Sequence, residues 1–181
     1  NIKKILKEKI KIIGAGRTDS GVHALGQSAN FFVNKEIKDL KKFQNSINFF
    51  LSNNSISIKD IKKKKKKFHS RYDAKERIYE YKITNRYSVL ALNKSRSWHI
   101  KKKIDIDILR KGSKILIGKH DFSTFRSSSC SARSAVKKMN DIKIFKTGEN
   151  ITIQFKSKSY LQNQVRSMVG CLKYLSCKKW N

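Results

Sequence analysis

The stretch VKKMNDIKIFKTGENITIQFKS, residues 136–157, decides the fold of this chain. Its two apolar, β-branched runs, at residues 136–146 and 151–157, are typical of strands. Residues 147–150 between them hold the glycine of a tight hairpin turn. From about residue 160 to residue 175, apolar side chains then recur at three- and four-residue spacings, which predicts an amphipathic helix. Together these elements predict an antiparallel sheet with a helix on one face.

The rest of the chain repeats this pattern of short strands and amphipathic helices. Apolar spacing predicts helices at 37–51 and 104–117, and strands at 10–13, 27–33, 55–61, 77–83 and 98–100. Helices segregated onto antiparallel sheets define an α+β fold. The two halves of the chain echo each other, and we expect two ferredoxin-like halves with antiparallel sheets, an N-terminal half at 1–85 and a C-terminal half at 86–181.

The chain carries a large excess of positive charge. Its 181 residues include 43 Lys and Arg against 13 Asp and Glu, which gives a formal net charge of +30 at pH 7. Such a charge makes a polyanion, and nucleic acid first, the partner to consider. Lysine dominates this excess and proline is absent, which indicates compositional drift. Basic residues beside a chemical motif therefore count for more than the total, and the lysine run at 62–67 predicts a solvated loop.

Cysteine usage and apolar content indicate the compartment. Cys130, Cys171 and Cys177 form neither a C-x-x-C pair nor an even disulfide set, so we expect the reducing cytoplasm and no thiolate metal site. No apolar run reaches the roughly 18 residues that a membrane-spanning helix needs, and no membrane partner is expected. The chain begins with Asn1 rather than Met, which indicates a fragment or an incomplete gene product.

The glycine-rich loop GAGRTDSGVHALGQ, residues 14–27, holds the densest cluster of unusual residues. A dinucleotide-binding fingerprint would need a third glycine where Asp19 stands, and a P-loop would need Gly-Lys-Ser or Gly-Lys-Thr. Both nucleotide interpretations therefore fail. What remains is an acid in a flexible loop that a polynucleotide backbone can approach, with Asp19 as a nucleophile or base. The spacing alone equally allows Asp19 to be a turn-capping residue.

This loop and four later motifs resemble a known family. Residues 16–27 are similar to the signature loop of the tRNA pseudouridine synthase A family. The later motifs follow in the family's order, namely FHSR at 68–71, RIYEY at 77–81, GKHDFSTFR at 118–126 and NQVRSMVG at 163–170. The resemblance implies an isomerase that acts on uridines in the anticodon stem-loop of tRNA. It breaks the N-glycosidic bond and rejoins the same uracil through its C5 carbon.

The resemblance also implies roles for particular residues. Asp19 matches the catalytic acid, which forms a covalent adduct with the substrate or otherwise drives loss of the base. Tyr79 matches the aromatic residue that lies against the target base, and Arg166 matches the helix arginine that pairs with the catalytic carboxylate. Arg17 resembles the residue that fills the gap left by the flipped base. The resemblance further implies that the two halves form a central cleft and that residues 1–85, which carry the Asp19 loop, are the catalytic half. It implies a homodimer, and it implies neither a metal nor a cofactor.

The family pattern extends beyond both ends of this chain. It includes a strand and a helix before the loop, and a further stretch after the last helix, so the first half is expected to be incomplete. An inactive RNA-binding α+β module or fragment is the alternative function, since the basic surface and Tyr79 would also serve it. A ribosome-associated basic protein is a weaker alternative, in which Asp19 would be dispensable. Tyr81 is expected to be a core residue, and His23 a structural one.

Overall fold

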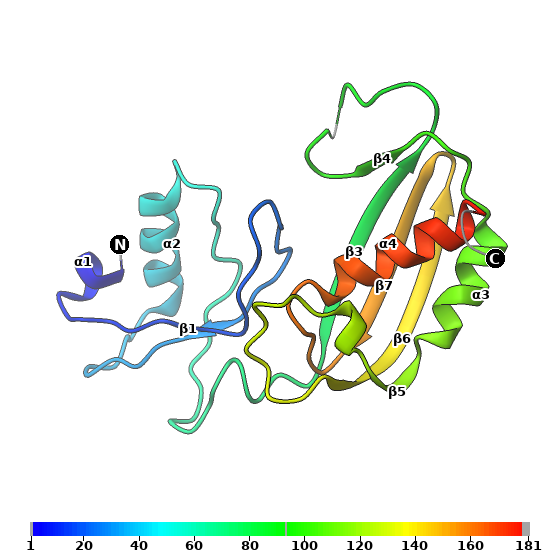
Figure 1. The fold of residues 1–181 in the computed structure, drawn as a ribbon. Helices are drawn as coiled ribbons and strands as arrows, with labels where there is room; N and C mark the ends of the chain where they lie inside the picture. The colour runs from blue at the N-terminus through cyan, green and yellow to red at the C-terminus, as the bar shows by residue number, and fades with distance from the viewer. Residues whose placement is uncertain (1, 93, 179–181) are drawn as a thin grey trace. The chain divides into compact units, whose positions relative to one another are not determined.

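The computed structural model describes residues 2–92 and 94–178, and the chain divides into two compact units, Asn1–Ala74 and Lys75–Asn181 (Figure 1). Helices and sheets occur in both units, so the predicted α+β class is confirmed. Among the described residues of unit 1, the sheet is a single two-stranded pair. The ferredoxin-like organisation of that half therefore stays a prediction. No helix in the described part of the chain is long and apolar enough to cross a membrane.

Unit 1 is built around helix α2. The helix begins after Asp39, whose side chain accepts a hydrogen bond from the Lys42 backbone N–H at 2.8 Å and so caps the helix. Phe43 and Ile47, one turn apart, are buried, and the Phe31 ring lies 6.4 Å from that of Phe43. The elements of the unit are α1 (Ile2–Leu6), β1 (Ile13–Gly14), β2 (Ala29–Asn30) and α2 (Leu40–Leu51).

The strand predicted at residues 55–61 is wrong, because none of these residues is in a strand. Side chains of α2 hold this segment instead. Gln44 and Asn48 donate to the Ile58 carbonyl at 2.9 and 3.0 Å, and the Ile58 N–H donates to Asn48 at 2.7 Å. These side chains satisfy the backbone groups that a neighbouring strand would otherwise bind. The lysine run at 62–67 lies in an exposed loop, as predicted.

Unit 2 is a five-stranded sheet in the order β4-β3-β7-β6-β5 (Figure 1). Its neighbouring strands are antiparallel except β3 and β4, which are parallel, so the sheet is mixed where the sequence predicted antiparallel sheets. The predicted hairpin is confirmed, with β6 and β7 paired from Met139↔Ser157 to Thr147↔Asn150. The unit contains β3 (Arg77–Asn85), β4 (Trp98–Ile100), α3 (Ile106–Ile115), β5 (Gly118–Asp121), η1 (Ser123–Phe125), β6 (Val136–Thr147), β7 (Asn150–Ser157) and α4 (Gln164–Ser176).

The core of unit 2 lies between the sheet and helices α3 and α4. Alternate residues of β7 point toward the helices and are almost fully buried, as expected for the inner face of a strand. One contiguous cluster joins the two layers and includes Ile83, Leu109, Ile151, Ile153, Phe155, Met168, Val169 and Leu172. This packing gives β3 and α4, which carry Tyr79 and Arg166, a rigid base.

One boundary and one strand differ from the sequence prediction. Strand β3 belongs to unit 2, because it pairs with β7 from Arg77↔Ser157 to Thr84↔Asn150, whereas the sequence assigned it to the first half. Strand β5 was not predicted, because GKHD at 118–121 lacks an apolar alternation. It forms because it pairs with β6 along its whole length. At the junction of α3 and β5, Gly118 has a φ of 116°, a conformation that favours glycine.

Gly112 on α3 allows close contact with α4. A Cβ atom at this position would lie 2.7 Å from Leu175 Cδ2 and 3.1 Å from Leu172 Cδ2. We expect Gly112→Ala to leave stability nearly unchanged, because the leucine methyl groups can shift and alanine favours the helix by about 1 kcal/mol. Gly112→Leu should lower the free energy of unfolding by about 1–3 kcal/mol through overpacking. Urea unfolding measures both.

The matched control is Lys111→Leu, at the adjacent exposed position of α3. It adds the same side chain without a neighbour to displace, and it should keep the stability of the parent. Equal stability of the Gly112→Leu and Lys111→Leu proteins would contradict this account of the contact between the helices.

Candidate active site

The glycine-rich loop is closed at its base by the short strands β1 and β2. These strands pair Ile13 with Asn30 and Gly14 with Ala29. One residue further into the loop, the Ala15 N–H donates to the Ser28 carbonyl at 2.8 Å. The Gln27 side chain then donates to the Gly16 carbonyl at 2.5 Å. The two ends of the segment are thereby held together, and residues 17–26 form an exposed loop apart from the half-buried Val22.

Asp19 opens a tight turn within this loop. The Val22 N–H donates to the Asp19 backbone carbonyl at 3.0 Å, and Gly21 between them has a φ of 76°. A positive φ at this third position is what a type II turn requires, and glycine adopts it without strain. The Asp19 residue is exposed, as is Arg17 two residues before it. The turn uses the backbone of Asp19, so its carboxylate is not needed to form that hydrogen bond.

Sequence reasoning missed Ser70, which ties the loop to the rest of unit 1. This serine is 2% exposed, and its hydroxyl donates to the Ile13 carbonyl at 2.8 Å. Its N–H donates to the Asn30 side chain at 2.9 Å. Ser70 therefore contacts both strands that carry the loop. The only signal in the sequence is its place in the FHSR motif, because its partners lie far away along the chain.

Gly21 offers a test of how strictly the loop must hold Asp19. We expect Gly21→Val to strain the turn, because a β-branched residue is poorly tolerated at a positive φ. A displaced carboxylate should lower the rate of the proposed uridine conversion by about 10- to 100-fold. The thermal midpoint should change little, since the loop is exposed. The control is Gly26→Ala, in the same loop, where a Cβ meets no atom within 4 Å and φ is not positive. Equal activity of the Gly21→Val and Gly26→Ala proteins would contradict the requirement that the turn hold Asp19 in position.

Tyr79 lies on β3 in unit 2, half-buried and packed against the core. Its ring makes an edge-to-face contact with the ring of Tyr160, with centroids 4.8 Å apart. The Tyr160 hydroxyl donates to the Arg77 carbonyl at 3.2 Å, which anchors that ring in turn. Burial raises the pKa of the Tyr160 hydroxyl, and the neighbouring Tyr79 raises it further. The hydroxyl therefore stays a neutral donor at ordinary pH. Sequence analysis did not single out Tyr160, which supports Tyr79 within unit 2.

Arg166 is an exposed residue in the first turn of α4. The turn before it is fixed by Asn163, which has a φ of 62° and accepts a hydrogen bond from the Ser167 N–H at 3.0 Å. The positive charge of Arg166 acts on the Tyr81 hydroxyl: burial raises the pKa of Tyr81, and Arg166 opposes that rise. Tyr81 packs against the core as predicted, and it also lies in the field of Arg166.

The structure therefore places the four predicted residues in two pairs. Arg17 and Asp19 share the exposed loop of unit 1, and Tyr79 and Arg166 belong to unit 2, on β3 and α4.

The HDFS motif forms a compact turn in unit 2. The Ser123 N–H and hydroxyl both donate to the Asp121 carboxylate, at 2.8 and 2.6 Å, and these hydrogen bonds lower the pKa of Asp121. Phe122 between them is buried. Asp121, the last residue of β5, therefore stabilises the turn that leads into η1. Within the described residues, no group of three His, Cys, Asp or Glu side chains is arranged to hold a metal ion.

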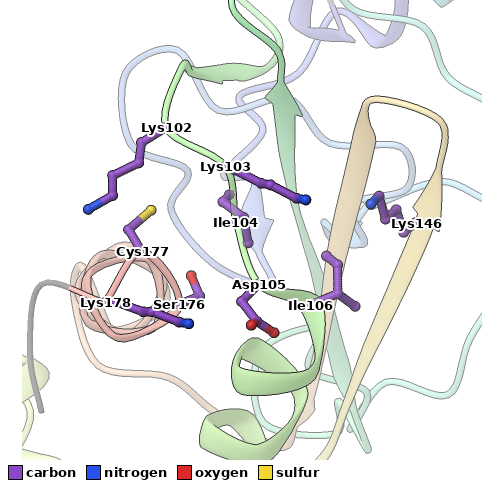
Figure 2. Close-up of a pocket in the computed structure, with 9 residues that line it drawn as sticks. All are labelled: Lys102, Lys103, Ile104, Asp105, Ile106, Lys146, Ser176, Cys177 and Lys178. Atoms are coloured by element: carbon purple, nitrogen blue, oxygen red, sulfur yellow. The ribbon is translucent and has the colours of Figure 1, made fainter.

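A cavity of about 550 Å³ lies elsewhere in unit 2, between the start of α3 and the end of α4 (Figure 2). None of the four predicted site residues lines it. Its four lysine side chains point in different directions, so they do not converge on one anion. The lining residues are Lys102, Lys103, Ile104, Asp105, Ile106, Lys146, Ser176, Cys177 and Lys178.

An exposed carboxylate in a glycine-rich loop, with an arginine beside it, is an arrangement that an enzyme acting on a flipped nucleotide can use. Comparison with known proteins identifies the class more closely. A family described as tRNA pseudouridine synthase matches residues 1–73 and 113–181. The chain belongs to this family. The matched segments contain Arg17, Asp19 and Arg166, while Tyr79 lies in the stretch between them.

Individual relatives cover nearly the whole chain. The tRNA pseudouridine synthase A of Pelagibacter ubique is 55% identical over 180 residues, which are 99% of this chain and 73% of the relative. The protein of the same name from Neorickettsia sennetsu is 41% identical over 93% of this chain and 69% of its own length. The one from Caulobacter vibrioides is 37% identical over 99% of this chain and 72% of its own length.

Proposed function

We propose that this protein is an isomerase that converts uridine to pseudouridine in the anticodon stem-loop of tRNA. The observation that carries the proposal is the exposed Asp19 in the closed GRTDSG loop, in a chain that belongs to the tRNA pseudouridine synthase family. A carboxylate held in a rigid, open turn suits an attack on a nucleotide that has been flipped out of its stack.

The reaction needs no change of oxidation state. The bond between C1′ of the ribose and N1 of uracil breaks, and a bond between C1′ and C5 forms. C5 loses its hydrogen as a proton, and N1 gains a proton, so substrate and product contain the same atoms. The reaction therefore requires a charged group at the ribose, a surface that holds the detached base, and a route for one proton.

Each of the four residues has a role in this proposal. Asp19 supplies the carboxylate that drives loss of the base. Tyr79, braced by Tyr160, offers its ring to the uracil. Arg166 pairs with the Asp19 carboxylate and keeps it ionised, since a nearby cation favours the charged form. The planar guanidinium of Arg17 fills the space that the flipped base leaves in the RNA.

The partner follows from the same argument. A formal charge of +30 complements the phosphate backbone of tRNA.

The protein is expected to work in the cytoplasm as a homodimer and without a metal or an organic cofactor. Sedimentation equilibrium tests the homodimer directly, with a single species of twice the chain mass as the expected result.

The experiment is to incubate the protein with an unmodified tRNA transcript and to analyse the nucleosides after digestion. Pseudouridine should form in the anticodon stem-loop, and primer extension after chemical labelling of pseudouridine locates it. A gel shift on the same samples reports binding. If the RNA shifts but all the uridine stays unmodified, the protein is the RNA-binding module considered above and the proposed activity is wrong.

A further inference from the structure

A second aromatic surface lies on unit 2, at strand β4. Trp98 is 37% exposed and lies on β4, the edge strand of the five-stranded sheet. Lys173 on α4 places its ammonium group 5.7 Å from the centre of the Trp98 ring and 4.4 Å from that of Tyr174. Exposed aromatic rings with a cation over them are the groups that hold unpaired bases and their phosphates.

A cavity of about 310 Å³ opens beside this ring. Its volume is at the lower end of the range for small-molecule sites, about 300–1,000 Å³, and suits one nucleobase. Three of its six lining residues are apolar or aromatic and three are polar, one of them a lysine, which gives a stacked base both a surface and a positive charge. The lining residues are Val89, Leu90, Lys94, Ser97, Trp98 and His99.

The Trp98 surface continues the face of the sheet that carries Tyr79. Along β3, Tyr79, Tyr81 and Ile83 alternate onto one face, and the parallel register places Trp98 beside Ile83. The rings of Tyr81 and Trp98 contact edge to face, with centroids 6.1 Å apart. Since the charge of Arg166 acts on Tyr81, the aromatic row and the arginine belong to one surface of unit 2.

We propose that Trp98 and Lys173 form a second stacking site, which takes an unpaired base of the RNA substrate close to the target uridine. The inference rests on the proposed function for the identity of the RNA. Trp98 supplies the stacking ring, and Lys173 and Lys94 attract the phosphates on either side of the base. The site makes Trp98 a binding residue and assigns it no part in bond breaking.

The chain offers a matched control in Tyr87. This tyrosine is also exposed and also has a lysine over its ring, with the Lys101 ammonium group 5.7 Å from the ring centre. Unlike Trp98, it does not line the cavity of about 310 Å³. If any exposed aromatic residue with a cation would bind RNA, the two residues should behave alike. If the cavity matters, they should differ.

The first measurement uses the fluorescence of Trp98 in a Trp180→Phe protein, where Trp98 is the only tryptophan. Adding an unmodified tRNA transcript should quench this fluorescence in a saturable way, and a five-residue oligouridine should do so at higher concentration. No quenching at a tRNA concentration that saturates a gel shift would overturn the proposal. So would quenching that grows with protein concentration in the absence of RNA, because a second copy of the chain would then cover the ring.

The second measurement compares affinities for the same tRNA. Trp98→Ala should weaken binding by about 5- to 150-fold, the range for loss of one stacked base. Trp98→Phe should retain most of the affinity, and Tyr87→Ala should stay within about twofold of the parent. Equal affinities of the Trp98→Ala and Tyr87→Ala proteins would overturn the proposal. Circular dichroism checks that each variant folds. If the Trp98→Ala protein does not fold, the quenching of Trp98 fluorescence by tRNA decides whether the proposal holds.

Failure of this inference can be told apart from failure of the proposed function. Pseudouridine formation by the parent protein is measured in the same tRNA samples. If the parent makes no pseudouridine but tRNA quenches Trp98, the activity is wrong and the stacking site stands. If the parent makes pseudouridine while tRNA leaves Trp98 unquenched, the activity stands and the stacking site is wrong.

Discussion

Replacing Asp19 with asparagine should abolish pseudouridine formation and leave tRNA affinity within a few-fold of the parent. An amide keeps the shape of the side chain but lacks the negative charge that a nucleophilic carboxylate needs. Because the turn is formed by the backbone of Asp19 and by Gly21, the substitution should leave the loop in place. We expect the single-turnover rate on a labelled tRNA to fall by about a thousandfold or more, as for the loss of other essential nucleophiles.

The control for this variant is Asp73→Asn in the same unit. Asp73 is also exposed, and its carboxylate accepts a hydrogen bond from the His69 N–H at 2.9 Å, outside the glycine-rich loop. This variant should convert uridine at close to the parent rate. If Asp19→Asn also converts uridine at the parent rate, Asp19 is not the nucleophile, and the turn-capping interpretation of that residue is the correct one.

Replacing Tyr79 with alanine has the second largest expected effect. The substitution removes the ring proposed to lie against the uracil, and it removes the edge-to-face partner of Tyr160. Loss of one stacking contact costs about 1–3 kcal/mol, which corresponds to a 5- to 150-fold lower kcat/KM. Steady-state kinetics on an anticodon stem-loop transcript measures this effect.

Three further variants separate the stacking role of Tyr79 from the supporting role of Tyr160. Tyr79→Phe keeps the ring and should stay within a few-fold of the parent, while Tyr160→Phe loses only the hydrogen bond to the Arg77 carbonyl. Tyr160→Ala removes the brace and should lower kcat/KM less than Tyr79→Ala does. If Tyr79→Ala retains the parent kcat/KM while Tyr160→Ala does not, the two rings have exchanged the roles proposed for them.

Elements whose structure depends on residues nearby along the chain could be predicted from the sequence. The β6–β7 hairpin is specified by its own turn, since Gly148 has a φ of 57° between two β-rich runs. Helix α2 is specified by its apolar spacing and by the capping side chain of Asp39. In these cases the period of the pattern and the local hydrogen bonds agree.

Elements that depend on distant partners could not be predicted. The pattern of Ile56 and Ile58 resembles a strand, but the polar side chains of α2 take its backbone hydrogen bonds. The pattern of β5 resembles no strand, but β6 supplies a partner for it. Pairing of this kind is a tertiary effect, and it overrides the weak intrinsic preference of a short segment.

The residues of the candidate site also fall into those that could be predicted from the sequence and those that could not. Asp19 and its loop stand out in the sequence because glycines and an acid cluster there, whereas the roles of Tyr79 and Arg166 came from the resemblance to the family. Ser70 has no sequence signal beyond its place in the FHSR motif and Tyr160 has none, because each acts through a contact with a carbonyl far along the chain. Trp98 stands out only once a cavity and Lys173 are placed beside it.

The measurement that tests the central proposal most directly is tritium release from a tRNA transcript labelled at C5 of its uridines. Joining C5 to the ribose must expel the hydrogen at C5, so isomerisation releases tritium into water and binding alone does not. The account predicts release by the parent protein in step with pseudouridine formation, and none above background from an Asp19→Asn protein that still binds the tRNA. Saturating binding by the parent without tritium release would contradict it.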